Sequence, residues 1–162
     1  AGSGGCPSPI LPDGSMLALP IPDAVSRVRY RDLTWHGRNI GALLPGLAGA
    51  RPGADDGAHL DPDLRAEMLE RPANWRPIFG QHGAAWGHLR NQGVAPRDIF
   101  LFFGLFREIA NDGTFVPRAP ARHLLWGWMQ IETRGPLVPV PTFVHEAAAQ
   151  SPSSVGSAIR QT

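Results

Sequence analysis

Proline and glycine restrict what this chain can fold into more than any other feature. The 162 residues include 17 Pro and 19 Gly, and both are spread along the sequence instead of being gathered in one segment. A proline inside a helix removes a hydrogen bond and clashes with the preceding turn, so the Pro-rich residues 2–22 are expected to be extended or turn backbone. We therefore expect a loop-rich fold with short helices and strands.

The composition is that of a folded domain. Hydrophobic residues make up 43% and charged residues 18%, which argues against a disordered tail. The longest apolar run, residues 99–103, has the length of a strand and is far shorter than the roughly 18 residues of a membrane span, so no membrane contact is expected. A single cysteine, Cys6, excludes an intrachain disulfide and fits a reducing, cytoplasmic location.

Several segments predict β-structure. Residues 98–103 consist of Asp98 followed by an apolar, aromatic run, which predicts a strand buried on both faces. The Asn-Asp-Gly triplet at 111–113 lies between apolar segments and predicts a hairpin, and the Pro-Asp-Gly triplet at 12–14 predicts a tight turn. Residues 123–131 predict a further strand, and residues 16–19 a short edge strand.

The expected helices are short. Residues 40–44 favour a brief helix, and the Pro- and Gly-containing residues 45–57 an exposed loop. A helix is expected over residues 61–70, because Asp caps a helix and the following Pro is tolerated at its first position. Another fits residues 83–92 and ends at Gly93.

Strands with short helices inserted, and no regular βαβ alternation, predict an α+β fold. We expect a small, curved and barrel-like sheet carrying two short helices. The division expected along the chain is a single domain over residues 1–146 and a loose tail, rich in Ala and Ser, over residues 147–162.

The helix at 83–92 carries the first set of candidate site residues. One face places His82, Trp86 and Leu89 at helical spacing, toward the core. The other face and the helix entry carry amides and an imidazole, which offer the donors and acceptors needed to read the edge of a base. The alternative is that these groups only cap the helix and bond nearby loops. They are Gln81, His88, Asn91 and Gln92.

A second candidate set alternates along the chain. His59, Asp61 and Asp63 would share one face of an extended segment, where they could bind a metal or act as acid and base. The competing interpretation is structural: Asp61 caps the expected helix and Asp63 interacts with its dipole. We favour the cap and expect no metal site.

Arg107 and two tryptophans complete the candidates. Arg107 follows the apolar strand and could hold a phosphate at the end of the sheet, or instead form a surface ion pair with Glu108 or Asp112. Trp126 and Trp128 would share one strand face. Both are expected in the core, and the alternative is a platform on which bases stack.

Motifs of the common enzyme classes are absent from the sequence. There is no phosphate-binding P-loop, no dinucleotide-binding Gly motif, no nucleophile elbow, no zinc-protease His motif and no deaminase His/Cys set. The net charge of +1 argues against a surface that coats DNA. Whether the chain is an enzyme stays open, and no cofactor is indicated.

An ordered set of short strings resembles the third nucleotide-modification-associated domain family. The strings, which run through residues 2–131, are Gly4-Gly5-Cys6-Pro7-Ser8-Pro9-Ile10, Leu19-Pro20-Ile21-Pro22, His59-Leu60-Asp61-Pro62-Asp63-Leu64, Phe79-Gly80-Gln81-His82-Gly83-Ala84-Ala85, His88-Leu89-Arg90-Asn91-Gln92-Gly93-Val94 and Asp98-Ile99-Phe100-Leu101-Phe102-Phe103-Gly104. Against the family pattern, the chain starts within the first string and lacks the usual ending, so truncation at both ends is expected. Trp86 replaces an expected polar residue.

The resemblance implies a bacterial or phage protein that helps to make or handle modified nucleotides, with no established reaction. It implies nucleotide or nucleic-acid partners, together with other nucleotide-modification proteins. Under this reading His88 is the expected acid or base, Gln81, Asn91 and Gln92 bind substrate with His59 and Asp61, and Arg107 holds phosphate. The alternatives are a non-catalytic reader of a modified base, for which PUA-like barrels offer a fold-level analogy, and a structural or interaction domain.

Overall fold

The computed structural model describes residues 6–48, 52–136 and 157–160. Strands and helices alternate irregularly along this part of the chain. In chain order the elements are β1 (Ser8–Ile10), β2 (Ile21–Pro22), the 3₁₀ turn η1 (Tyr30–Asp32), β3 (Thr34–Trp35), β4 (Arg38–Asn39), α1 (Ile40–Ala48), β5 (Ala58–His59), the 3₁₀ turn η2 (Ala66–Met68), β6 (Ile78–Gln81), α2 (Gly83–Asn91), β7 (Ile99–Glu108), β8 (Arg122–Gln130), β9 (Arg134–Pro136) and β10 (Ser157–Arg160).

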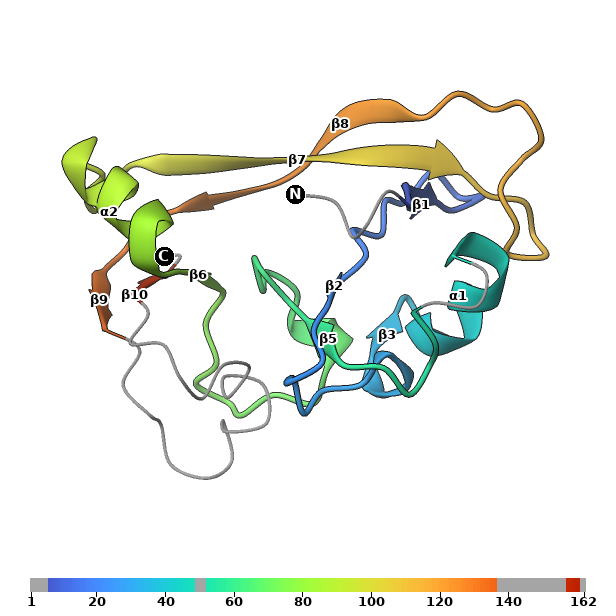
Figure 1. Ribbon diagram of the computed structural model, residues 1–162, viewed down its shortest axis with the longest axis horizontal. Coiled ribbons are helices and arrows are strands. Elements are labelled where there is room, and N and C mark those ends of the chain that lie inside the picture. Colours follow the sequence, from blue (N-terminus) through green and yellow to red (C-terminus); the bar gives the residue numbers. More distant parts are fainter. Residues whose placement is uncertain (1–5, 49–51, 137–156, 161–162) are drawn as a thin grey trace.

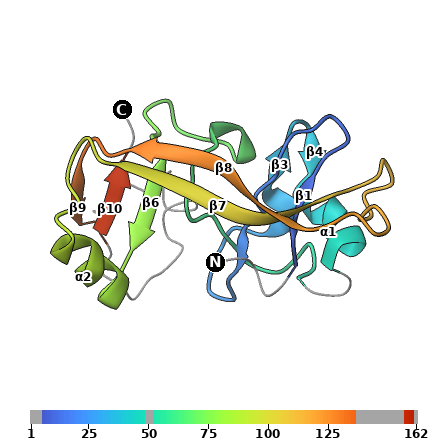
Figure 2. The same ribbon diagram turned by 90° about the horizontal axis from the view of Figure 1, so that it is seen from above.

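A long two-stranded ribbon spans the molecule. β7 and β8 pair antiparallel from Ile99 opposite Gln130 to Phe106 opposite Arg122, and β1 adds a short parallel strand at one end of β7. Figure 1 shows this ribbon running along the top of the molecule. One of its ends lies above the N-terminal strands and α1, and the other lies near α2 and β6. Figure 2 shows the same arrangement from above. The ribbon therefore connects two parts of the fold.

Each part has its own apolar cluster. The larger cluster gathers residues from the N-terminal half, and Tyr30, Leu33 and Ile40 in it are fully buried. The smaller cluster contains Phe102 and Met129 from the ribbon, together with Leu64, Phe79 and Leu89 among others. Burial of a large apolar side chain stabilises a fold by roughly 1.5–3 kcal/mol, so both clusters contribute substantially.

Helix α1 is longer than the sequence predicts. Its start is capped by Asn39, whose Oδ1 accepts the N–H of Ala42 at 3.0 Å. The loop expected over residues 45–57 is wrong at its start, because the helix continues past Pro45 to Ala48. The reason is that Leu47 extends the buried face of the helix by one further turn.

The helix expected over residues 61–70 is also wrong, since only the short turn η2 forms there. Asp63 instead pairs with Ile78 through two backbone hydrogen bonds of 2.8 and 2.9 Å. Its carboxylate receives a hydrogen bond of 2.6 Å from Arg71. Asp61 likewise caps no helix, because it accepts the N–H of Gly80. These distant partners hold the segment extended.

Strand β7 is buried on one face and not on both. Phe102 is 9% exposed, whereas Leu101 and Phe103 on either side are 53% and 63% exposed. Their cross-strand partners Trp128 and Leu125 are exposed as well. Within the described part of the chain, one face of the ribbon packs on the smaller cluster while the other faces outward, so the prediction of a doubly buried strand is wrong.

Other local predictions are confirmed. The Pro-Asp-Gly triplet at 12–14 forms a turn in which Gly14 takes φ +83°, and the triplet at 111–113 joins a hairpin with Ile109 opposite Phe115. Helix α2 ends before Gly93, which has φ +71°.

The edge strand expected over residues 16–19 does not form. Met16 makes only an isolated bridge with Ile10.

The α+β class is confirmed. The described strands form four separate sheets and not a closed barrel, so the barrel-like part of the prediction is unconfirmed. Residues 157–160 of the expected tail form β10, between β6 and β9. The rest of that tail lies outside the described residues, so the domain boundary stays a prediction. Among the residues that the structure describes, no helix has the length and hydropathy to cross a membrane.

Candidate functional site

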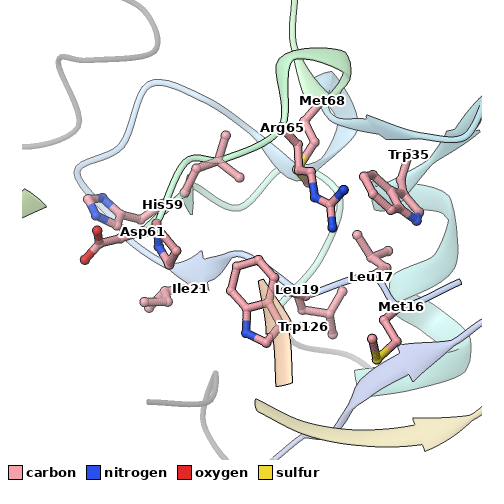
Figure 3. A pocket seen from close by; sticks show the side chains of 13 residues that line it. Met16, Leu17, Leu19, Ile21, Trp35, His59, Asp61, Arg65, Met68 and Trp126 are labelled. Atoms are coloured by element: carbon pink, nitrogen blue, oxygen red, sulfur yellow. The ribbon is translucent and has the colours of Figure 1, made fainter. Parts of the chain in front are cut away.

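A pocket opens where the two apolar clusters meet. Its volume is about 40 Å³, and most of its wall is apolar, formed by segments that precede β2 and follow β5. Figure 3 shows two aromatic rings and three polar side chains around it. These five residues, which the following paragraphs take in turn, are Trp35, His59, Asp61, Arg65 and Trp126.

A bulge in β8 aims Trp126 at the pocket. Phe102 of β7 pairs with Gly127 and Phe103 pairs with Leu125, so Trp126 between them has no partner across the ladder. The ring of Trp126 consequently packs beside Phe102, with the ring centroids 5.7 Å apart, while Trp128 is 55% exposed. The expectation that both tryptophans share one core face is therefore wrong. Bulges re-aim side chains in this way next to functional sites.

Trp35 and Arg65 form a second aromatic feature. Trp35 is 3% exposed, and the guanidinium of Arg65 lies 4.7 Å from the centre of its ring. The Nε1 of Trp35 is buried and has no hydrogen-bond partner among the described residues. In Figure 3 the Arg65 side chain extends beside Trp35 toward the pocket. A cation is thus held over a fixed ring at one side of the pocket.

The other side of the pocket is acidic. His59 lies on β5, opposite Ile21 of β2, and its Nδ1 is 3.6 Å from a carboxylate oxygen of Asp23. That distance exceeds a hydrogen bond, and the nitrogen is buried without another partner in the described part of the chain. Figure 3 shows the carboxylate of Asp61 beside the His59 ring. An imidazole therefore lies close to two carboxyl groups.

Asp61 joins the pocket to β6. Its carboxylate accepts the backbone N–H of Gly80 at 3.1 Å and the side-chain amide of Gln81 at 3.4 Å. Burial raises the pKa of Asp61, and this effect outweighs the opposing influence of the Gly80 hydrogen bond and of His59 and His82. A carboxyl group with a raised pKa takes up a proton more readily, so it can donate as well as accept a hydrogen bond.

The structure brings three of the sequence-predicted site residues together. His59 and Asp61 line the pocket, and Gln81 contacts Asp61 from β6. Their chemistry is that of an acid–base pair with an amide neighbour. Among the residues described, no three His, Cys, Asp or Glu side chains gather in a group that could hold a metal ion.

The remaining predicted residues lie elsewhere. His88, Asn91 and Gln92 are exposed on and after α2, and none of them lines the pocket. Arg107 donates a hydrogen bond of 2.9 Å to the carbonyl of Val116 and lies over the ring of Phe115. The functional roles expected for these four residues stay predictions.

The ion pair considered as the alternative for Arg107, with Glu108 or Asp112, does not form within the described residues. Glu108 pairs with Arg122 at 2.7 Å, and Asp112 accepts the N–H and the hydroxyl of Thr114. The reason is the strand register, which places Arg122 opposite Phe106 near the end of the ribbon and leaves Arg107 directed toward the hairpin loop.

Sequence reasoning missed three residues of the site. Arg65 continues the alternation of His59, Asp61 and Asp63, and following that pattern for two more residues could have found it. Asp23 and Trp35 carry no local signal, because they come from segments that meet only in the folded chain.

The comparisons with known proteins give one family. A family model described as nucleotide modification associated domain 3 matches residues 1–153, which is most of the chain. No curated protein and no solved structure matches the chain.

Proposed function

Because the chain belongs to the nucleotide modification associated domain 3 family, we propose that it binds the base of a nucleotide in the pocket next to Trp126. The family supports a role in nucleotide modification, and the pocket supplies a place where a nucleotide can be held. In this proposal the protein handles a nucleotide that is being modified or has been modified.

One observation carries the proposal: an aromatic ring and a hydrogen-bonding end share the same pocket. Trp126 offers a flat apolar surface, and base–aromatic stacking contributes about 1–3 kcal/mol per base. Asp61 and His59 offer a donor and acceptor end. A nucleobase has the complementary construction, a flat apolar face and a polar edge.

The size of the pocket sets how a base enters. A cavity of about 40 Å³ has space for only two or three water molecules. A base therefore inserts its edge toward Asp61 and keeps one face against Trp126. Displacing water from an apolar wall favours this mode of binding.

Binding is tested with the tryptophan variants of β8. Trp126→Ala removes the stacking surface, whereas Trp128→Ala removes an exposed ring of the same strand and serves as the matched control. We expect isothermal titration with nucleosides of natural and modified bases to show binding that Trp126→Ala weakens at least 10-fold and Trp128→Ala leaves unchanged. Equal effects of both variants, or no binding of any base, would refute the proposal.

A second candidate is acid–base catalysis on the bound base. It is supported by the raised pKa of Asp61, because burial makes this carboxyl group hold a proton more readily, and a positioned carboxyl group can transfer a proton to or from a bound base. Asp61→Asn keeps an acceptor for the Gly80 N–H but cannot titrate. We expect this variant to bind bases within about threefold of the wild type and to lower the modified-nucleotide content of producing cells strongly.

His88→Ala tests the competing catalytic residue on α2. If His88 is the acid or base, its variant lowers the modified-nucleotide content and Asp61→Asn does not. If both variants leave that content unchanged while Trp126→Ala loses binding, the protein acts as a non-catalytic reader of the base.

A further inference from the structure

We infer that Arg65 binds the phosphate of the nucleotide, so that the ligand class of the pocket is a nucleoside phosphate. The inference rests on the proposed function, since it places a base in the same pocket. It adds the orientation of the ligand in that pocket. It also assigns a binding role to Arg65, which is not among the site residues predicted from the sequence.

Arg65 has no acidic partner within the described residues. Some of the other arginines there pair with carboxylates, for example Arg71 with Asp63 at 2.6 Å and Arg122 with Glu108 at 2.7 Å. The guanidinium of Arg65 lies instead over the ring of Trp35, 4.7 Å from its centre. It is also the single arginine in the pocket wall, so its charge is available to a ligand there.

Stacking on Trp35 prepares the guanidinium for an anion. The contact places the guanidinium carbon over the Trp35 ring, and within the described residues no hydrogen bond engages the N–H donors of Arg65. Those donors form the fork that binds a phosphate through two parallel hydrogen bonds. Because Trp35 is 3% exposed and fixed in the larger cluster, the position of the guanidinium is largely set before a ligand arrives.

The charges of the pocket fix the direction of the ligand. Asp61 and Asp23 lie with His59 on the side away from Arg65, as Figure 3 shows for Asp61 and His59. A phosphate near the two carboxyl groups would be repelled, whereas the polar edge of a base can bond with them. The base edge therefore faces Asp61 and the phosphate faces Arg65, with Trp126 between them along the wall.

The experiment compares each nucleoside with its 5′-monophosphate by isothermal titration. For the wild type we expect the monophosphate to bind about 10- to 100-fold more tightly, the range of a charged hydrogen-bonded contact, with affinity falling as salt is raised. Arg65→Gln should abolish this preference, so that the nucleoside and its monophosphate bind with equal affinity. Arg65→Lys should keep part of it, because an ammonium retains the charge without the fork.

The control is Arg76→Gln, which removes an arginine that is 52% exposed and outside the pocket wall. Equal binding of nucleoside and monophosphate by the wild type, or a preference that survives Arg65→Gln, overturns the phosphate assignment. If nucleosides still bind and need Trp126, the proposed function stands without it. If neither nucleoside nor monophosphate binds, both fail.

A further titration tests whether the phosphate belongs to a free nucleotide or to a nucleic-acid strand. A mononucleotide and a short single-stranded oligonucleotide of the same base present the same chemistry to Arg65. Tighter, Arg65-dependent binding of the mononucleotide identifies free nucleotide as the ligand, and the reverse order identifies a nucleic-acid strand. Either result supports the assignment, and loss of Arg65 dependence in both arms contradicts it.

Discussion

The Nη2 of Arg71 donates a hydrogen bond of 2.6 Å to Asp63 Oδ1, and the two side chains are 6% and 4% exposed. Asp63 belongs to the segment that also carries Asp61 and Arg65. Arg71 also lies 4.5 Å from the centre of the Trp75 ring, while its Nε and Nη1 are buried without a hydrogen-bond partner in the described chain. This contact links the pocket wall to the loop that precedes β6.

Removing Arg71 should destabilise the fold strongly. Arg71→Met leaves the Asp63 carboxylate buried without its cation, and loss of one partner of a buried ion pair costs about 3–5 kcal/mol. Urea unfolding at pH 7 measures the change. The control is Arg76→Met. Arg76 forms a half-exposed ion pair with Glu132 at 3.9 Å, so its loss should lower the free energy of unfolding by under about 1 kcal/mol. Similar losses for the two variants would contradict the structural role of the pair.

The same pair predicts how stability changes with pH. Burial is the largest influence on Asp63 and raises its pKa from 3.8 to about 6, although Arg71 opposes the rise. Between these values the folded protein binds more protons than the unfolded chain does. The contribution of Asp63 to the free energy of unfolding is therefore complete below about pH 4 and is lost as the pH rises through about 6.

Unfolding of the wild type and Asp63→Asn from pH 4 to pH 7 tests this dependence. The variant lacks the titrating group. The difference in the free energy of unfolding between the two proteins should therefore change most between pH 4 and pH 6. Arg71→Met should move the midpoint of the wild-type change upward, because the guanidinium lowers the pKa of Asp63. If this free-energy difference were constant from pH 4 to pH 7, Asp63 would not be the source of the pH dependence.

The one-sided burial of β7 predicts opposite outcomes for neighbouring residues. Phe102→Ala should cost about 3–5 kcal/mol, because Phe102 packs among Phe79, Phe100 and Trp126. Leu101→Ser should stay within about 0.5 kcal/mol of the wild type, since Leu101 is 53% exposed. Thermal unfolding of both variants under one condition gives the comparison. A large loss for Leu101→Ser would show that this face of the ribbon is covered in solution.

The sequence predicts features that are fixed by a few adjacent residues. The turn at 12–14, the hairpin at 111–113 and the end of α2 at Gly93 all depend on local backbone conformations that Gly and Asp favour. Each was predicted correctly for that reason. His59 and Asp61 were also recognised as candidates, because their alternation is visible in the chain.

The sequence does not predict features that depend on distant partners. Local signals favoured a helix at 61–70, but the contacts of Asp63 with Ile78 and Arg71 hold that segment extended. The bulge that re-aims Trp126 is set by the register of β7 against β8, which no short pattern encodes. The pocket itself exists only because the two clusters meet.

Two glycines beside the pocket predict contrasting effects. A Cβ on Gly57 would lie 1.9 Å from the carbonyl oxygen of Asp23, and the Asp23 N–H bonds Gly57 O at 2.9 Å, so neither backbone can move without breaking this contact. Gly57→Ala should cost about 1–3 kcal/mol or more and should displace Asp23 from His59, which weakens ligand binding. Gly80→Ala is the control, because nothing lies within 4 Å of its Cβ and its N–H still reaches Asp61. Urea unfolding and nucleotide titration of both variants test the pair. Equal tolerance of the two substitutions would mean that the close approach of Gly57 to Asp23 does not shape the pocket.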